Sequence, residues 1–194
     1  MQLDYDFFKI NKKLTPKRGR IIISEPFLPG NYFSRSTILL VECSEKGAIG
    51  FILNKPVETE VKDLFKDFPD FGAEVYVGGP VGNESIYYIH TLGDKLHGSI
   101  HVKDNLYWGG DFEHLKSLIG AGLVELNQVR FFIGYSGWSE GQLEKEIVEN
   151  SWLVTDVPVE AIMNSDEDFW IDSVKNAGGH YELWQNFPED PTLN

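Results

Sequence analysis

The sequence predicts one α+β domain in which a mixed or antiparallel sheet curls around a single core. Segments with the composition of strands are many and short, and segments with helical spacing fall irregularly among them. No alternation of strand and helix runs long enough for a doubly wound parallel sheet. The chain has 194 residues, of which 42% are hydrophobic, and this is enough apolar material for one sizeable core.

The first half of the chain is expected to consist mainly of strands. Residues 36–42 form a continuous apolar run that suits a strand buried on both faces. The turn at residues 44–47 leads into residues 48–53, so these two strands are predicted to form a hairpin, which Pro56 ends. The other elements expected here are strands at residues 20–24, 74–77, 85–90 and 98–102, with a short helix at residues 60–68.

The second half is expected to hold most of the helices. Asp111 is a good N-cap for a helix over residues 112–120, because its carboxylate can accept the free amide hydrogens of the first turn. Ser139 and Gln142 have the spacing of a capping box, which predicts another helix behind them. The remaining elements expected are strands at residues 129–133 and 151–154, a helix beginning at Pro158, and a helix after Ser165 that Gly178 and Gly179 end.

The charge of the chain predicts against direct binding of nucleic acid. Thirty acidic and seventeen basic residues give a formal net charge of −13, which repels a phosphate backbone at long range. The basic residues near the N-terminus are a local exception, for which a solvated surface is favoured over a nucleic-acid or acidic-partner contact. They are Lys12, Lys13, Lys17, Arg18 and Arg20.

The same sequence predicts a cytoplasmic protein with no membrane contact. It has no apolar run of the roughly 20 residues that a membrane span needs, and its first residues lack the features of a signal peptide. Cys43 is the only cysteine, which excludes an internal disulfide and a cysteine-based zinc site.

Four blocks of sequence form a specific combination along the body of the chain. They are residues 23–26 with 33–36, residues 47–56, residues 78–81 with 89–90, and residues 134–138 continuing through 141–144, 146 and 151–153. In this order they resemble the AlgH family of bacterial proteins, and the resemblance extends from Gly19 to about Gly178. One departure is Glu42-Cys43, where the family usually has Glu-His, and this argues against an essential ligand at that position.

The resemblance implies a compact fold in which a branched sheet closes into a partial barrel with helices around it. It also implies a regulatory role, because the family takes its name from the control of alginate synthesis. It implies no reaction and no catalytic residue, since none is established for the family.

Three segments are predicted on this basis. Residues 1–18 are expected to form a helical extension that Pro16 ends, residues 19–180 the AlgH-like domain, and residues 181–194 a loose polar tail. The apolar face of the extension consists of Leu3, Phe7, Ile10 and Leu14, and the side chains of the tail that could pack are Trp184 and Phe187.

Ser136 invites comparison with a hydrolase nucleophile, because it follows a strand and precedes a helix. The sharp turn of such a site needs Gly-x-Ser-x-Gly, and Trp138 occupies the last of those positions. A glycine-flexed connection anchored by Trp138 is therefore favoured. The first amides of the following helix could bind an anion, but capping by Gln142 is the default interpretation.

The histidines and glycines of the motifs give weak signals for chemistry. Gly78 and Gly79 lack the surrounding pattern of a phosphate-binding loop, so a positive φ at a strand exit is favoured. His90 ends an apolar strand and is interpreted as a hydrogen-bonded structural residue. His97 and His101 have no established metal-ligand spacing, and no metal or cofactor is predicted.

Two functional hypotheses remain. The leading one is a non-enzymatic regulatory or interaction protein, a regulator of transcription among the possibilities, which acts through a protein partner or a small ligand. The alternative is a small-molecule-binding protein or hydrolase-type enzyme, with its pocket where the motif loops are expected to meet at one end of the sheet. No catalytic residue is predicted, and the candidate ligand-binding residues are Asn54, Gly78, Gly79, His90, Tyr135, Ser136, Trp138 and Gln142.

Overall fold

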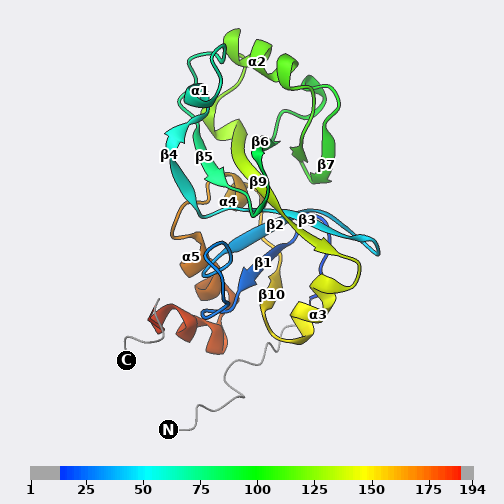
Figure 1. The fold of residues 1–194 in the computed structure, drawn as a ribbon, viewed down its shortest axis with the longest axis vertical. Coiled ribbons are helices and arrows are strands. Elements are labelled where there is room, and N and C mark those ends of the chain that lie inside the picture. Colours follow the sequence, from blue (N-terminus) through cyan, green and yellow to red (C-terminus); the bar gives the residue numbers. More distant parts are fainter. Residues whose placement is uncertain (1–13, 189–194) are drawn as a thin grey trace.

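Strand β9 (Val129–Ser139) is the branch point of the sheet. In the computed structural model, which describes residues 14–188, its first half pairs antiparallel with β6 (Val81–His90) and parallel with β5 (Glu74–Val77). Its second half pairs antiparallel with β3 (Gly47–Ile52). One strand therefore joins three neighbours, and the sheet is both branched and mixed (Figure 1).

The main path of the sheet is antiparallel throughout, in the order β10–β1–β2–β3–β9–β6–β8–β7. The predicted hairpin is present, with Ser44 opposite Gly47 at its turn. The strands not yet bounded are β1 (Ile21–Ser24), β2 (Thr37–Ser44), β7 (Ile100–Lys103), β8 (Leu106–Trp108) and β10 (Trp152–Thr155).

The sheet does not close, so the expected partial barrel is not confirmed. The end strands β10 and β7 form no ladder with each other. The two strands are connected by a salt bridge instead. Lys103 Nζ, at the end of β7, lies 2.5 Å from Oδ1 of Asp156, which follows β10 directly. What the structure establishes is an α+β domain with one large, mainly antiparallel sheet.

The segment after β3 differs from its prediction. Strand β3 ends before Pro56 as predicted, but the residues from Pro56 form a further strand, β4 (Pro56–Glu60), which was not predicted and pairs with β5 alone. The helix expected at residues 60–68 is only α1 (Val61–Leu64). Proline is tolerated at the start of an edge strand because its missing amide hydrogen is not needed there.

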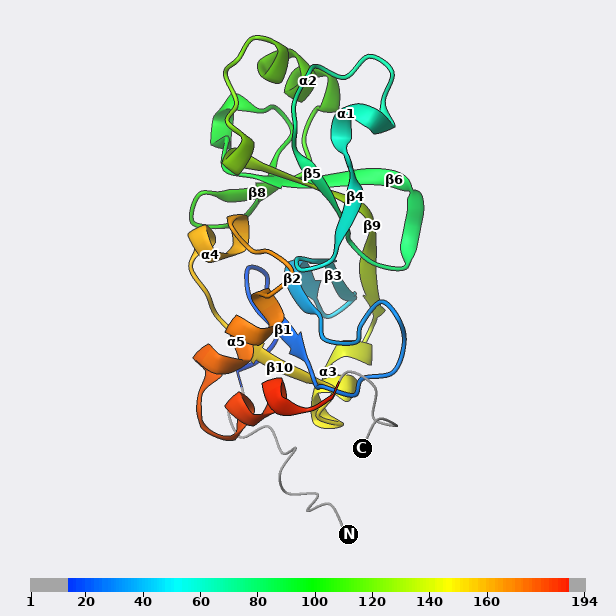
Figure 2. The same cartoon turned by 90° about the vertical axis from the view of Figure 1, so that its left-hand side faces the viewer.

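The helices gather at the two ends of the molecule. Figures 1 and 2 show α1 and α2 (Phe112–Gly120) at one end, and α3 (Gln142–Val148) and α5 (Phe169–Ala177) at the other. Asp111 caps α2 as predicted, accepting a hydrogen bond from His114 N at 3.0 Å. The remaining helical elements are α4 (Val159–Met163) and the 3₁₀ turns η2 (Gly93–Lys95), η3 (Leu126–Gln128) and η4 (Gly179–Asn186).

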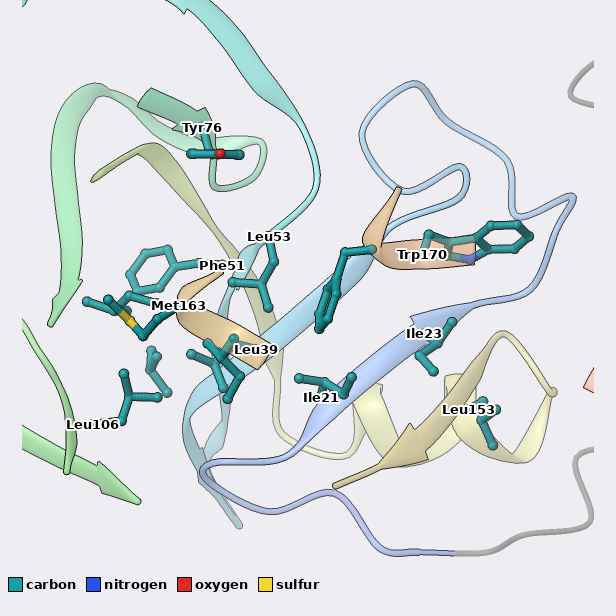
Figure 3. Packing of buried hydrophobic residues seen from close by; sticks show 14 of the residues in the cluster. Ile21, Ile23, Leu39, Phe51, Leu53, Tyr76, Leu106, Leu153, Met163 and Trp170 are labelled. Carbon is teal, nitrogen blue, oxygen red and sulfur yellow. The ribbon is translucent and has the colours of Figure 1, made fainter. Parts of the chain in front are cut away.

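The core lies on both faces of the sheet around β1. Ile21 and Ile23 point into the main cluster, which α4 and α5 cover, and Ile22 points into a second cluster beneath α3. Figure 3 shows members of the main cluster from β1, β2, β10 and the two helices. A strand that is buried on both faces needs a continuous apolar sequence, which Ile21–Ser24 supplies.

The residues after 180 also contribute to the core. Trp184 of η4 has no exposed surface, and Tyr181 is buried beside it with the two rings 5.3 Å apart. Residues 189–194 lie outside the described residues, as do residues 1–13 with most of the helix expected there. The division of the chain into three segments stays a prediction.

The crossing of the Gly78–Gly79 segment with β9 leaves no room for a side chain. A methyl group at Gly79 would lie 2.3 Å from the carbonyl carbon of Tyr135 and 2.4 Å from Ser136 N. We expect Gly79→Ala to lower the free energy of unfolding by about 3 kcal/mol or more, because two stretches of backbone must separate. Urea denaturation measures this change.

A matched substitution separates crowding from backbone strain. Gly141 also has a positive φ of 71°, but no atom lies within 4 Å of a methyl group built there. Gly141→Ala should therefore cost only about 1 kcal/mol. Equal costs for the two variants would show that the crossing at Gly79 is not tightly packed.

Candidate functional site

Gly78, Gly79 and Ser136 lie together where β3, β5 and β9 meet. The carbonyl oxygen of Gly78 accepts hydrogen bonds from Ile52 N at 3.0 Å and from Ser136 Oγ at 3.1 Å. The Ser136 side chain has no exposed surface. These groups are thus engaged in joining the strands, and the Ser136 hydroxyl is not presented to a substrate.

Asn54 is buried next to this junction and organises the loop that precedes β2. Its Oδ1 accepts a hydrogen bond from Thr37 N, and its Nδ2 donates one to the carbonyl oxygen of Arg35, both at 2.9 Å. A side-chain amide that holds two backbone groups in this way fixes the course of the loop. Asn54 thereby places its neighbours Arg35 and Lys55, rather than facing a ligand itself.

The expected meeting of all the motif loops at one end of the sheet is wrong. His90 is paired with Val129 at the start of β9, whereas Trp138 is paired with Ala48 near its end. At about 3.3 Å per residue along a strand, these positions are about 30 Å apart along β9. The proposed ligand-binding roles of the individual residues stay predictions, but one pocket cannot contain them all.

His90 is a fully buried histidine whose ring nitrogens are both engaged. Nδ1 accepts a hydrogen bond from Leu92 N at 3.2 Å, so Nε2 carries the hydrogen and donates it to Gly109 O at 3.0 Å. Burial lowers the pKa of His90 from 6.5 to about 4. The prediction of a hydrogen-bonded structural histidine is confirmed.

The other two histidines of the predicted cluster do not join His90. His97 stacks on His114 with ring centroids 4.8 Å apart, and His101 Nε2 lies 2.9 Å from Asp104 O. Within residues 14–188, no group of three or more histidine, cysteine or acidic side chains is placed to hold a metal ion.

Trp138 and Gln142 belong to a hydrogen-bonded network centred on Glu146, which is half-buried. Glu146 Oε2 accepts hydrogen bonds from the indole nitrogens of Trp138 at 2.8 Å and Trp152 at 2.7 Å. Gln142 Oε1 accepts from Ser139 N at 3.0 Å, and its Nε2 donates to Glu146 Oε1 at 3.0 Å. Gln142 thus satisfies Ser139 N, but the predicted capping box is wrong, because α3 begins at Gln142 with Gly141 as its N-cap and Ser139 ends β9.

Tyr135 is the remaining predicted residue, and it is only half-buried. Its ring meets that of Tyr87 edge to face, with centroids 5.5 Å apart. The neighbouring Asn83 approaches the hydroxyl of Tyr32 at 3.5 Å. This aromatic contact contributes packing between β6 and β9.

A cleft of about 540 Å³ lies beside the residues that Asn54 positions. Two of the sequence blocks contribute to it, because Ser34 and Arg35 come from one and Lys55 from another. The first turn of α5 and the residues before it form the opposite wall. The full lining is Asn31, Ser34, Arg35, Lys55, Glu167, Asp168, Trp170 and Ile171.

Lys55 is a cation held in this cleft, and residues 14–188 provide it with no carboxylate partner. Its Nζ donates to the carbonyl oxygen of Asn31 at 2.8 Å, and no acidic side chain of residues 14–188 comes within 4.0 Å of it. The side chain is half-buried, and the loss of solvent lowers the pKa of Lys55 below its usual 10.5. An anion placed beside this ammonium would offset that cost.

Arg35 is the second cation of the cleft, and its position is tightly constrained. Its φ of 47° lies in the left-handed region, which residues other than glycine seldom adopt. Its guanidinium lies over the Trp170 ring, 5.0 Å from the centroid, and donates a hydrogen bond to the carbonyl oxygen of Phe187. Unusual backbone conformations of this kind are often retained at ligand sites.

Sequence reasoning missed both of these cations as candidates. The available signal was their place inside two separate sequence blocks of a chain with few basic residues, seventeen in all. It also missed Arg130, which is only 5% exposed and donates to Ile162 O at 2.7 Å and Leu53 O at 2.9 Å. Arg130 ties the end of α4 to the sheet, and its ring contact with Tyr76, at 4.2 Å, is part of the same support.

Comparisons with known proteins identify the family of this chain. The family model described as AlgH-like matches residues 21–182. The chain belongs to the AlgH-like family. A UPF0301 protein of Parabacteroides distasonis is 43% identical to this AlgH-like chain over 193 residues, covering 97% of the chain and 98% of the relative. A UPF0301 protein of Bacteroides thetaiotaomicron is 41% identical over the full length of both.

Solved structures show that the fold is shared more widely in the AlgH-like family. The crystal structure of a Corynebacterium diphtheriae protein matches with a TM-score of 0.75 and 22% identity, covering 96% of this chain and all of that one. The solution structure of the AlgH protein from Pseudomonas aeruginosa matches with a TM-score of 0.70 and 23% identity, covering 91% and 98%. At this identity the likeness establishes the fold alone.

Among the described residues of the AlgH-like chain, no helix is both long and apolar enough to cross a membrane.

The buried His90 predicts how stability depends on pH. Its pKa is about 4 in the folded chain and about 6.5 when exposed, so the unfolded chain binds the proton first as pH falls. The free energy of unfolding is therefore unaffected by His90 above about pH 6.5 and falls as pH is lowered, by about 3 kcal/mol at pH 4. Urea denaturation across this pH range measures it.

The control uses an exposed histidine. In His90→Gln, the free energy of unfolding should depend less steeply on pH between 4 and 6.5, because glutamine does not bind a proton. This expectation holds whatever the substitution does to stability at neutral pH. His101→Gln should keep the slope of the unmodified chain, since His101 is exposed. An unchanged slope in the His90→Gln protein would contradict the assignment.

Proposed function

We propose that this chain is a binding protein for a small anionic ligand, which Lys55 and Arg35 hold in the cleft beside α5. Its role is then regulatory, through ligand-dependent interaction with another protein, rather than catalytic. The observation that carries the proposal is the half-buried side chain of Lys55, which lines a cleft of about 540 Å³ and has no carboxylate partner among residues 14–188.

The energetics favour an anion at this place. A cation that has lost solvent is destabilised until an opposite charge or a set of acceptors compensates it. Among residues 14–188, Lys55 donates to one acceptor, the carbonyl oxygen of Asn31, and an ammonium group has three hydrogens to donate. Ser34 and Asn31 add neutral polar groups to the lining, and a volume of this size suits a small molecule.

The family relationship supports a regulatory role without defining it. The Pseudomonas relative is named AlgH, and the sequence relatives carry family names that specify no activity. If the chain influences transcription, we expect it to act through a protein partner, because its net charge of −13 opposes direct contact with DNA. We propose a cytoplasmic location for the same chain.

The alternative of a hydrolase-type enzyme has less support. The hydroxyl of Ser136 donates to Gly78 O and is buried, and His90 lies near the other end of β9. A serine nucleophile needs a base within hydrogen-bond reach and access to the substrate. The described arrangement places Ser136 in the framework of the sheet.

The test is a thermal-shift screen followed by calorimetric titration with small carboxylates and phosphates. An anion at 100 times its Kd should stabilise the protein by about 2.7 kcal/mol, which is roughly 5–10 °C in Tm for a chain of this size. Lys55→Gln should weaken the binding at least tenfold, because it removes the charge and keeps most of the side chain.

Two further measurements make this prediction specific. Lys46→Gln removes a charge from the exposed hairpin turn and should leave the affinity unchanged. Affinity should also fall as pH rises through the pKa of Lys55, which lies below 10.5, since the neutral amine no longer attracts an anion. If no carboxylate or phosphate binds, or if Lys55→Gln binds as well as the unmodified chain, the proposal is wrong.

A further inference from the structure

The cleft at Lys55 has charges of both signs on its lining. Lys55 and Arg35 come from the loops around β2 and β3, whereas Glu167 and Asp168 immediately precede α5. Neither Glu167 nor Asp168 takes part in an ion pair within the part of the chain described. The opposite charges therefore face the same space without contacting one another across it.

We infer that the ligand of this cleft is a small zwitterion that carries a carboxylate and an ammonium group, such as an amino acid or a dipeptide. This inference rests on the proposed anion-binding function and names its ligand class. The carboxylate would pair with Lys55 and Arg35, and the ammonium with Glu167 and Asp168.

The pattern of charge selects this class over a simple anion. An anion near Lys55 gains a favourable contact but is repelled by the two carboxylates on the same lining. An ammonium group on the ligand reverses the sign of that second interaction. A ligand with both groups thus turns an attraction and a repulsion into two attractions.

The geometry of the cleft agrees with a ligand of this kind. Ion pairs in this chain form at 2.5–3.8 Å, but Lys55 lies more than 4.0 Å from both carboxylates, which leaves space for groups between them. The half-buried Ile171 adds apolar surface to the same lining. A volume of about 540 Å³ accommodates an amino acid with its side chain.

Three forms of one compound test the two charges separately. The twenty amino acids and a set of dipeptides are first screened by calorimetry with the full chain. The tightest binder is then compared with its N-acetyl form, which lacks the ammonium, and its amide, which lacks the carboxylate. We expect each modification to weaken binding at least tenfold.

Charge-removing variants then test whether Glu167 and Asp168 bind the ammonium group of the ligand. In the double variant Glu167→Gln/Asp168→Asn, the free compound should bind at least tenfold more weakly, while the N-acetyl form binds equally well or better. The matched control Glu140→Gln/Glu144→Gln removes two exposed carboxylates at α3 and should leave both affinities unchanged. Circular dichroism and Tm confirm that each variant is folded.

The outcomes separate this inference from the proposed function. If the N-acetyl and free forms bind equally well and both depend on Lys55, the site takes anions and the zwitterion inference is wrong. If no amino acid or dipeptide binds, the inference is also overturned, and the carboxylate and phosphate titrations then decide the proposed function alone. Loss of binding in the control variant would show a general effect of charge.

Discussion

The structure depends on the close approach of the Gly78–Gly79 backbone to β9. Where one strand has three neighbours, every amide and carbonyl must find a partner, since an unpaired buried group costs as much as a lost hydrogen bond. Gly78 meets this requirement by donating to Ile133 O at 2.8 Å and accepting from Ile52 N and Ser136 Oγ. Without side chains at these two positions, β3, β5 and β9 can be held in one sheet that has helices at both of its ends (Figure 1).

The same junction determines where the cleft can form. Leu53 and Asn54 follow β3 directly, and Asn54 binds the loop before β2 through two backbone groups. This contact sets Arg35 beside Lys55, although residues 36–54, which include all of β2 and β3, come between them. Packing of Trp170 into the main core brings the start of α5 to the other side. The contacts that hold the sheet and the core together therefore also position the residues of the candidate site.

Composition and spacing were sufficient for much of the fold, and the reasons for the exceptions are physical. Buried strands such as β2 were predictable because their sequences are continuously apolar, and α2 because Asp111 supplies a cap. Strand β4 was missed because it lies at an edge, where polar residues and a proline are tolerated. Closure into a barrel depends on how two distant end strands approach, which local sequence does not encode. The cleft was missed for a similar reason: its cations and acids come from segments that only long-range packing unites, whereas His90 could be interpreted from its own strand.

The pairing of strand β1 limits the order in which the chain can fold. Its partners are β2, which follows soon after it, and β10, which lies far along the chain. During synthesis, one edge of Ile21–Ser24 stays unpaired until Trp152–Thr155 has left the ribosome. The main cluster stays partly uncovered until α5 and Trp184 have also been made. Non-local pairing of this kind slows folding, because the entropy of a long loop is lost before the contacts form. Until β10 is made, the nascent chain carries an apolar strand with one unpaired edge, a state that favours aggregation.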